Sequence, residues 1–337
     1  LHKLAGRSML RHVIDATKTV GESKKVIVTG HGAEQVEETF ESADTKFVRQ
    51  EDQLGTAHAV SMAIPELCVD AIVVVLYGDV PLIRPVTLQR ILASVNEKSM
   101  GLLTISLDDP DGYGRIVRSA DGLIESIVEQ KDATNEQRNI CEINTGVMAL
   151  TSLQLRNWLP QISNNNAQGE YYLTDIIAIA RQSGIEVNSI NPESVTEVEG
   201  VNSRLQLSQL ERAHQLELAK QLMESGTTLA DPARFDQRGQ LSVGTDNFID
   251  INCIFEGNVT IGSNVSIGPN CCIINSTIGN DVEILANTII DSSEVGDSAV
   301  IGPFARIRPG TELAEHTKVG NFVETKKSQV GKGSKIN

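Results

Sequence analysis

Aliphatic and aromatic residues return at every sixth position along the C-terminal part of the chain. The series contains Ile249, Phe255, Ile261, Ile267 and Ile273, takes five-residue steps to Ile278 and Val295, and resumes as Ile301, Ile307, Leu313 and Val319. This period is the signature of a left-handed parallel β-helix, whose coils each contain three short strands with the aliphatic side chains stacked inside. Several of these residues are followed directly by glycine, and we expect the glycines to occupy corners with φ > 0. They are Gly262, Gly268, Gly279, Gly296, Gly302 and Gly320.

The remainder of the chain alternates β-rich runs with helical stretches, which is typical of an α/β domain with a mostly parallel sheet. The continuous apolar runs 26–30 and 71–77 predict central strands buried on both faces. From about Val198 to Ser225 the chain is rich in helix-forming residues, which predicts a long helix. We therefore expect an α/β domain at 1–200, a linker helix at 201–225 and a β-helix at 226–337.

Composition indicates a soluble globular protein, since 40% of the 337 residues are hydrophobic and 22% are charged. No apolar run approaches the roughly 20 residues needed to cross a bilayer. The net charge of −15 argues against binding to nucleic acid or to anionic membranes. We predict a cytoplasmic protein without membrane insertion. The five cysteines form no CxxC pair and are expected to be free thiols, mostly buried in the repeat.

Basic residues gather between positions 305 and 337, against the acidic character of the whole chain. This segment contains seven basic and three acidic residues, which gives a local excess charge of +4. The excess is explained equally well by an anionic ligand and by a solvated face with scattered cations. The basic residues are Arg306, Arg308, Lys318, Lys326, Lys327, Lys332 and Lys335, and the acidic residues are Glu312, Glu315 and Glu324.

A candidate nucleotide site lies where the run 71–77 ends. Ligands of open α/β sheets bind at the carboxyl ends of strands, and the run leads directly into Gly78-Asp79. Asp79 is placed like a ligand of Mg²⁺, which takes one or two protein oxygens together with phosphate oxygens. Upstream, a polar loop enters a helix near Gly55-Thr56, where free N–H groups can meet a ligand. Each of these residues has a structural alternative as a turn or cap residue.

Further motifs follow in order, and together they carry a family resemblance. They are Gly112-Tyr113-Gly114-Arg115-Ile116, Ile127-Val128-Glu129-Gln130-Lys131, Glu142-Ile143-Asn144-Thr145-Gly146, residues 164–172, Glu197-Val198-Glu199-Gly200-Val201-Asn202 and Gly302-Pro303-Phe304-Ala305-Arg306. With these motifs the chain resembles, along its whole length, the bacterial bifunctional N-acetylglucosamine-1-phosphate uridylyltransferases and glucosamine-1-phosphate N-acetyltransferases. The resemblance implies a Rossmann-like nucleotidyltransferase domain, a linker helix and a left-handed β-helix of hexapeptide repeats. It also implies a homotrimer.

The resemblance further implies attack of N-acetylglucosamine 1-phosphate on the α-phosphate of UTP, which gives UDP-N-acetylglucosamine and pyrophosphate for cell-envelope synthesis. Uracil, ribose and phosphate would be held by Gln50, by the pair Gly55 and Thr56, and by Tyr77, Gly78 and Asp79. Asp79 and Asn202 would hold Mg²⁺. Gly114, Glu129 and Asn144 would line the amino-sugar pocket.

In the β-helix, the resemblance assigns Arg308 and Lys326 to a glucosamine 1-phosphate site, which favours the anion interpretation of the basic excess. There the substrate amine would attack the thioester of acetyl-CoA with the help of a general base. In the family, a glycine-rich phosphate loop and a lysine precede the segment that matches Leu1, and the catalytic histidine follows the segment that ends at Asn337. We therefore expect this chain to contain no complete set of catalytic residues and to have neither activity at a useful level.

Two other interpretations stay open. The chain could be another sugar-nucleotide pyrophosphorylase, with a different base or sugar, whose β-helix serves regulation or assembly. It could also be a trimeric scaffold that binds a sugar nucleotide without turnover. An assay with other nucleotides in place of UTP distinguishes the first alternative from a uridylyltransferase, because a polar site built for one base binds a different base less well.

Overall fold

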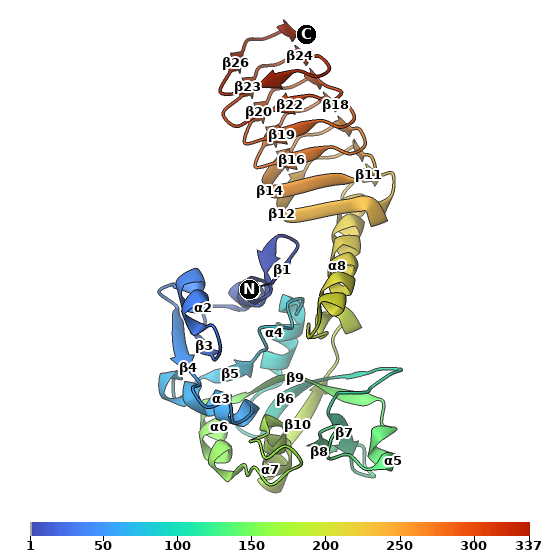
Figure 1. The fold of residues 1–337 in the computed structure, drawn as a ribbon. Coiled ribbons are helices and arrows are strands. Elements are labelled where there is room, and N and C mark those ends of the chain that lie inside the picture. The colour runs from blue at the N-terminus through green and yellow to red at the C-terminus, as the bar shows by residue number, and fades with distance from the viewer. Residues whose placement is uncertain (1) are drawn as a thin grey trace. The chain divides into compact units, whose positions relative to one another are not determined.

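The computed structural model describes residues 2–337, which form two compact units. One unit contains Met9–Val201, and the other contains His2–Ser8 together with Asn202–Asn337 (Figure 1). Residues 2–8 belong to the second unit because they contact a helix far along the chain. The Ala5 N–H donates to Glu211 Oε2 at 2.7 Å, and the hairpin of β1 (Lys3–Leu4) and β2 (Arg7–Ser8) lies against helix α8 (Arg204–Glu224).

The first unit is built on a six-stranded sheet, in which β9 (Glu142–Thr151) pairs antiparallel with β5, β6 and β7. The strand order is β10-β6-β9-β7-β8, with β5 also paired to β9. A separate parallel pair is formed by β3 (Lys25–Thr29) and β4 (Thr45–Arg49). The other strands of the sheet are β5 (Ile72–Val75), β6 (Ser99–Ser106), β7 (Arg115–Arg118), β8 (Ile124–Val128) and β10 (Glu186–Ile190).

Two expectations for this sheet are wrong. The sheet is not mostly parallel, because the pairings around β9 and between β7 and β8 are antiparallel, and such strands can be joined by short turns. The runs 26–30 and 71–77 do form strands, but these are not central. Among residues 2–337, β3 pairs with β4 alone and β5 pairs with β9 alone. Nor are the strands buried on both faces: Thr29 is the one buried residue of β3, and Ile72 of β5 is 46% exposed.

Helices cover both faces of the sheet. Met148 of β9 and Leu102 of β6 pack in one apolar cluster with Ile176 of α7 (Ile176–Gln182). The alternate residues Val147 and Leu103 pack in another with Leu88 of α4 (Pro85–Ala93). This alternation follows from the two-residue period of a strand. The other α-helices of the unit are α1 (Met9–Thr17), α2 (Ala33–Phe40), α3 (Thr56–Ala63), α5 (Asn135–Arg138) and α6 (Ser152–Trp158), with 3₁₀ turns at Lys18–Val20, Ile64–Glu66, Leu159–Gln161, Leu173–Asp175 and Val195–Glu197.

The main part of the second unit, from Asn202 onward, begins with α8, which confirms the predicted long helix although the helix starts later than expected. Ser203 lies before its first turn and its hydroxyl accepts a hydrogen bond from the Gln206 N–H at 3.1 Å, an N-cap that fixes the start. No helix within residues 2–337 is both long and apolar enough to span a membrane.

Beyond α8 the chain winds into parallel ladders of short strands, which confirms the predicted β-helix. One ladder runs β11-β13-β15-β18-β21-β24-β27, and the others join β12, β14 and the remaining strands. The strands are β11 (Thr227–Leu229), β12 (Phe235–Val243), β13 (Asn247–Ile249), β14 (Cys253–Ile261), β15 (Ser266–Ile267), β16 (Cys272–Ile274), β17 (Thr277–Ile278), β18 (Glu283–Ile284), β19 (Ile289–Asp291), β20 (Glu294–Val295), β21 (Val300–Ile301), β22 (Arg306–Ile307), β23 (Glu312–Leu313), β24 (Lys318–Val319), β25 (Glu324–Thr325), β26 (Gln329–Val330) and β27 (Lys335–Ile336). A 3₁₀ turn at Pro232–Arg234 precedes β12.

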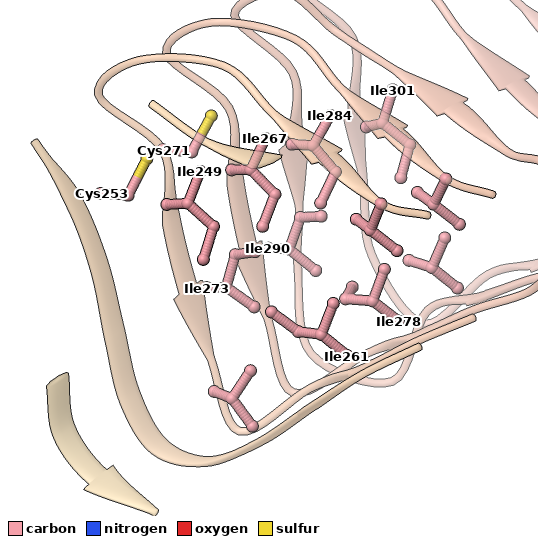
Figure 2. Packing of buried hydrophobic residues seen from close by; sticks show 14 of the residues in the cluster. Ile249, Cys253, Ile261, Ile267, Cys271, Ile273, Ile278, Ile284, Ile290 and Ile301 are labelled. Atoms are coloured by element: carbon pink, nitrogen blue, oxygen red, sulfur yellow. The ribbon is translucent and has the colours of Figure 1, made fainter. Parts of the chain in front are cut away.

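Aliphatic side chains stack inside the coils, as Figure 2 shows for the isoleucines of successive coils. The residues of the six-residue series are each at most 4% exposed. The thiols of Cys253 and Cys271 are buried in the same stack, and Cys272 is half-buried, whereas Cys68 and Cys141 are exposed. All five are free, as expected.

The glycines of the repeat are explained differently from the expectation. Of the six glycines named above, only Gly302 has φ > 0, and the left-handed corners lie two residues further on at positions such as Asn264 and Asp281. The glycines are instead required by close approach between coils. A Cβ at Gly262 would lie 2.7 Å from the Gly279 carbonyl oxygen, and a Cβ at Gly279 would lie 2.8 Å from the Asp297 nitrogen.

Candidate nucleotide and amino-sugar site

The residues predicted to contact uracil lie at the end of β4 and at the start of α3. Gln50 follows β4, and its Nε2 donates to the Gly55 carbonyl oxygen at 3.2 Å and lies 3.0 Å from Nδ1 of His58. Gly55 has φ +116°, and a Cβ there would approach the Tyr171 carbonyl oxygen to 2.6 Å. The Thr56 hydroxyl accepts from the Leu173 N–H at 3.0 Å. Glycine and threonine are thus required here to hold the loop, while the Gln50 side-chain oxygen stays available for a ligand.

Tyr77, Gly78 and Asp79 form the turn that leaves β5. The Val80 N–H donates to the Tyr77 carbonyl at 3.2 Å, and the Val201 N–H donates to the Asp79 carbonyl at 3.0 Å. Burial, together with the negative charges of Glu129 and Asp79, raises the pKa of the Tyr77 phenol to about 12. The charges that act on this phenol thus come from both the nucleotide end and the sugar end of the predicted site.

The structure brings together the three residues predicted to line the amino-sugar pocket. The Asn144 N–H donates to the Gly114 carbonyl at 2.8 Å. A Cβ at Gly114 would lie 3.4 Å from Glu129 Oε2 and 2.9 Å from Ile127, so glycine lets the carboxylate approach the backbone. These contacts join the hairpin of β7 and β8 to β9.

Glu129 is partly buried among other acidic groups. Burial raises its pKa, the hydroxyl of Thr174 donates to Oε1 at 2.8 Å and lowers it, and Asp175 and Asp132 raise it. Burial, followed by the charge of Asp132, also raises the pKa of Asp175. Thr174 was not singled out by the sequence analysis. It stands two residues after the quoted stretch 164–172, and no local pattern places it beside Glu129.

The metal-binding prediction concerns Asp79 and Asn202. Within residues 2–337 no side chain donates to the Asp79 carboxylate and no cation pairs with it, so its oxygens are free to bind a metal. Asn202 follows Val201, is exposed, and uses its backbone N–H to donate to Gln206 Oε1 at 2.9 Å. A carboxylate and an amide are oxygen donors, the type that hard divalent cations prefer. No group of three or more His, Cys, Asp or Glu side chains able to hold a metal ion occurs in the described chain, so phosphate and water oxygens would complete the shell.

Arg308 and Lys326 lie on neighbouring coils of the β-helix. The Arg308 N–H donates to the Thr325 carbonyl at 3.0 Å, which aligns the two positions. The Arg308 guanidinium donates to Glu324 Oε1 at 2.6 Å, and this contact lowers the pKa of Glu324. An anionic ligand of Arg308 would compete with that carboxylate. The Lys326 ammonium has no partner in the described chain.

A cavity of about 380 Å³ lies beside α3, away from the cluster of Gly114, Glu129 and Asn144. Its wall includes Ala57, Ile64, Leu159 and Pro160, and its polar members include His58, Ser61 and Arg156. His58 also contacts Gln50, so the cavity touches the predicted uracil end through one side chain. None of the twelve predicted site residues lines it.

Comparison with known proteins supports a nucleotidyltransferase followed by a repeat domain. Residues 1–140 match the family model of the MobA-like NTP transferase domain, and residues 238–337 match that of the GMPPB C-terminal domain. Crystal structures of UDP-glucose pyrophosphorylase are similar in fold. The complex with UDP-glucose has a TM-score of 0.52 at 15% identity over 62% of this chain and 87% of that one. The apo form has a TM-score of 0.53 at 14% identity over 64% and 90%.

Relatives described as bifunctional protein GlmU match the chain over its whole length. The protein of Marinobacter nauticus is 55% identical and that of Cellvibrio japonicus 53% identical, each over all 337 residues. The chain spans 74% of the length of each of these relatives. A match at this identity that includes both units shows that the chain belongs to the GlmU family of bifunctional transferases.

Proposed function

We propose that the first unit carries the substrate site for transfer of UMP from UTP to N-acetylglucosamine 1-phosphate, and that the β-helix carries the site for acetylation of glucosamine 1-phosphate with acetyl-CoA. The observation that carries the first assignment is the meeting of Gly114, Glu129 and Asn144 beside Tyr77, which is two residues before Asp79 in the turn after β5. The residues predicted to bind the sugar thus lie beside the turn that carries Asp79. The nucleotide and thioester substrates place both reactions in the cytoplasm.

The residues of the site would act by orientation and charge. Glu129 accepts hydrogen bonds from sugar hydroxyls, and the Asn144 amide nitrogen donates one, so that an analogue without these groups leaves buried polar atoms unpaired. Gln50 orients the base. Asp79 and Asn202 would hold a divalent ion, which we propose to be Mg²⁺ and which would neutralise phosphate charge. No covalent intermediate with the protein is needed, because the sugar phosphate itself attacks the α-phosphate.

The test is Mg²⁺-dependent binding of UDP-N-acetylglucosamine, measured by titration calorimetry on the wild type and Asp79→Ala. We expect the substitution, or removal of Mg²⁺ with a chelator, to weaken binding by about 10- to 100-fold, the range for losing an interaction of a charged group. Asp70→Ala is the matched control, since Asp70 is exposed before β5 and Asp79 follows the strand. Equal binding of sugar nucleotides with other bases would favour a different pyrophosphorylase. In a chain with both ends restored, binding of the sugar nucleotide without pyrophosphate formation would favour the scaffold.

The acetyltransferase assignment is tested at Arg308. Arg308→Ala should weaken binding of glucosamine 1-phosphate by about tenfold, through loss of a charge-assisted hydrogen bond to phosphate. Lys332→Ala is the control, because Lys332 is an exposed cation of the same β-helix that pairs with Glu315 at 2.6 Å. Equal effects of the two substitutions would mean that only the general charge of the domain matters.

We also propose that the protein is a homotrimer. Support comes from Phe304 and Phe322, whose rings stack with centroids 5.1 Å apart and which remain 49% and 75% exposed. Exposed paired aromatics are typical of surfaces that are covered on association. Sedimentation velocity of the wild type and of Phe304→Ser/Phe322→Ser should give a trimer and smaller species, respectively. A monomeric wild type would contradict the proposal.

A further inference from the structure

The central strand β9 contains an irregularity where the sugar end of the site meets the nucleotide end. Leu102 pairs with Met148 and Thr104 pairs with Asn144, so a step of two residues along β6 corresponds to four along β9. The extra residues form a bulge, which we define as Thr145-Gly146-Val147. Bulges re-aim side chains and occur next to active sites.

The bulge is fixed by a side-chain hydroxyl. Thr145 is buried, and its hydroxyl donates to the Leu103 carbonyl at 2.8 Å and accepts from the Val147 N–H at 3.3 Å. Gly146 has φ +87°, a conformation that side chains with a Cβ rarely adopt. The bulge is therefore a defined structure with its own hydrogen bonds.

On one side the bulge holds the sugar-binding amide. The Gly146 N–H donates to Asn144 Oδ1 at 3.0 Å, which fixes the side-chain oxygen and leaves the amide nitrogen to face a ligand. The Asn144 N–H is bound to the Gly114 carbonyl. The position of Gly146 thus sets the orientation of Asn144.

On the other side the bulge seats the ring of Tyr77. A Cβ at Gly146 would lie 2.6 Å from Tyr77 Cε2, 3.1 Å from Cζ and 3.2 Å from Cδ2. These are ring atoms that cannot bend away individually, so any side chain at position 146 must displace the whole ring. Tyr77 is two residues before Asp79 in the turn after β5. Displacement of the ring therefore acts on the turn that carries the carboxylate.

We infer that the bulge is a positioning element and that Gly146 is a positioning residue for the transferase reaction, since it holds Asn144 and Tyr77 in one arrangement. This inference rests on the proposed uridylyltransferase function. Gly146 would touch neither substrate. It couples the amino-sugar end of the site to the nucleotide end, so that one substitution disturbs both.

The test compares two glycine substitutions. Gly146→Ala should weaken binding of UDP-N-acetylglucosamine by at least about tenfold, the effect of losing one well-placed polar contact. Gly122→Ala is the matched control, because Gly122 has φ +81° in the turn between β7 and β8 but has no neighbour within 4 Å of an added Cβ. Gly122→Ala therefore introduces the same backbone strain without displacing a ring. The affinity of this variant for UDP-N-acetylglucosamine should stay within about twofold of wild type, well below the tenfold step of 1.4 kcal/mol. Equal losses in the two variants would overturn the inference.

A double variant shows whether Gly146 acts through Tyr77. Tyr77→Leu removes ring atoms from the position that an alanine Cβ would need. Tyr77→Leu/Gly146→Ala should therefore bind no more weakly than Tyr77→Leu, whereas additive losses would show that Gly146 acts by another route. If Gly146→Ala alone fails to fold, this pair of variants still decides the question.

A measurement without ligand separates this inference from the proposed function. The ring resonances of Tyr77, assigned with Tyr77→Phe in protein labelled at tyrosine, should shift in Gly146→Ala and not in Gly122→Ala. An unshifted Tyr77 signal in folded Gly146→Ala would overturn the positioning role. If the wild type fails to bind UDP-N-acetylglucosamine while the signal shifts as expected, the assigned function is wrong and the coupling through the bulge stands.

Discussion

At the residue scale, Glu129 combines a proposed binding role with an unfavourable environment. Its carboxylate is partly removed from water and lies near Asp175 and Asp132, and only the Thr174 hydroxyl favours the charged form. The Glu129 carboxyl group is therefore protonated more readily in the folded protein than in the unfolded chain. A group in this situation is retained for function and at the expense of stability.

The expected consequence is opposite effects of Glu129→Gln on stability and on binding. Because the folded-state pKa is raised, Glu129 destabilises the protein increasingly as the pH rises from the usual carboxyl pKa through the folded value. Glu129→Gln should therefore melt at a higher temperature than wild type at pH 7, and the difference should disappear near pH 4. Binding of UDP-N-acetylglucosamine should weaken by about tenfold.

Calorimetric melting at the two pH values checks this prediction. Asp121→Asn, an exposed position in the turn between β7 and β8, serves as the charge control. A variant less stable than wild type at pH 7 would mean that the Thr174 hydrogen bond outweighs burial and the neighbouring carboxylates.

At the element scale, regular strands and their irregularities have different causes. The interior of the β-helix repeats because each coil must bury its aliphatic residues against the next, so the sequence repeats as well. The bulge in β9 has no such repeat. It depends on one buried hydroxyl that replaces ladder hydrogen bonds for the Leu103 carbonyl and the Val147 N–H.

Thr145→Val should therefore destabilise the first unit by about 1–3 kcal/mol, the cost of leaving buried polar groups unpaired. Valine has nearly the same shape, so packing changes little. Thr145→Ser keeps the hydroxyl and should lose clearly less. Urea unfolding of the two variants measures the difference, and equal losses would show that the methyl group, and not the hydroxyl, holds the bulge.

At the scale of the whole molecule, two units with separate apolar cores share one chain. The core of the β-helix contains Ile290, and the cores of the first unit include the single tryptophan, Trp158. Since no core cluster among residues 2–337 contains residues of both units, damage to one core is expected to leave the other intact.

Ile290→Ala should destabilise the β-helix by about 2–5 kcal/mol, the usual range for a buried isoleucine. Ile289→Ala in the same strand should cost less than about 1 kcal/mol, because Ile289 is 41% exposed. Circular dichroism should report the loss in Ile290→Ala, while the unfolding midpoint of Trp158 fluorescence stays at its wild-type value. A parallel shift of the Trp158 transition would show that the units unfold together.

Much of the architecture and part of the site could be predicted from the sequence. The period of the aliphatic residues predicts the β-helix, because a side chain inside a coil must recur with every turn of the prism. The position of Asp79 after an apolar run predicts a strand-end carboxylate, and β5 ends at Val75 as that prediction requires. The helix that begins at Arg204 was predicted from its composition.

Other features depend on contacts between distant segments, and only the tertiary structure decided them. Glycines such as Gly262 are needed where adjacent coils touch, and the left-handed corners fall two residues later, at positions such as Asn264. The period alone cannot distinguish these two uses of glycine. The antiparallel pairing of β9, the bulge that seats Tyr77 and the grouping of residues 2–8 with the second unit likewise depend on partners far along the chain. Local pattern determined which side chains had to be buried, whereas the backbone hydrogen bonds and close contacts formed on folding determined which residues meet at the site.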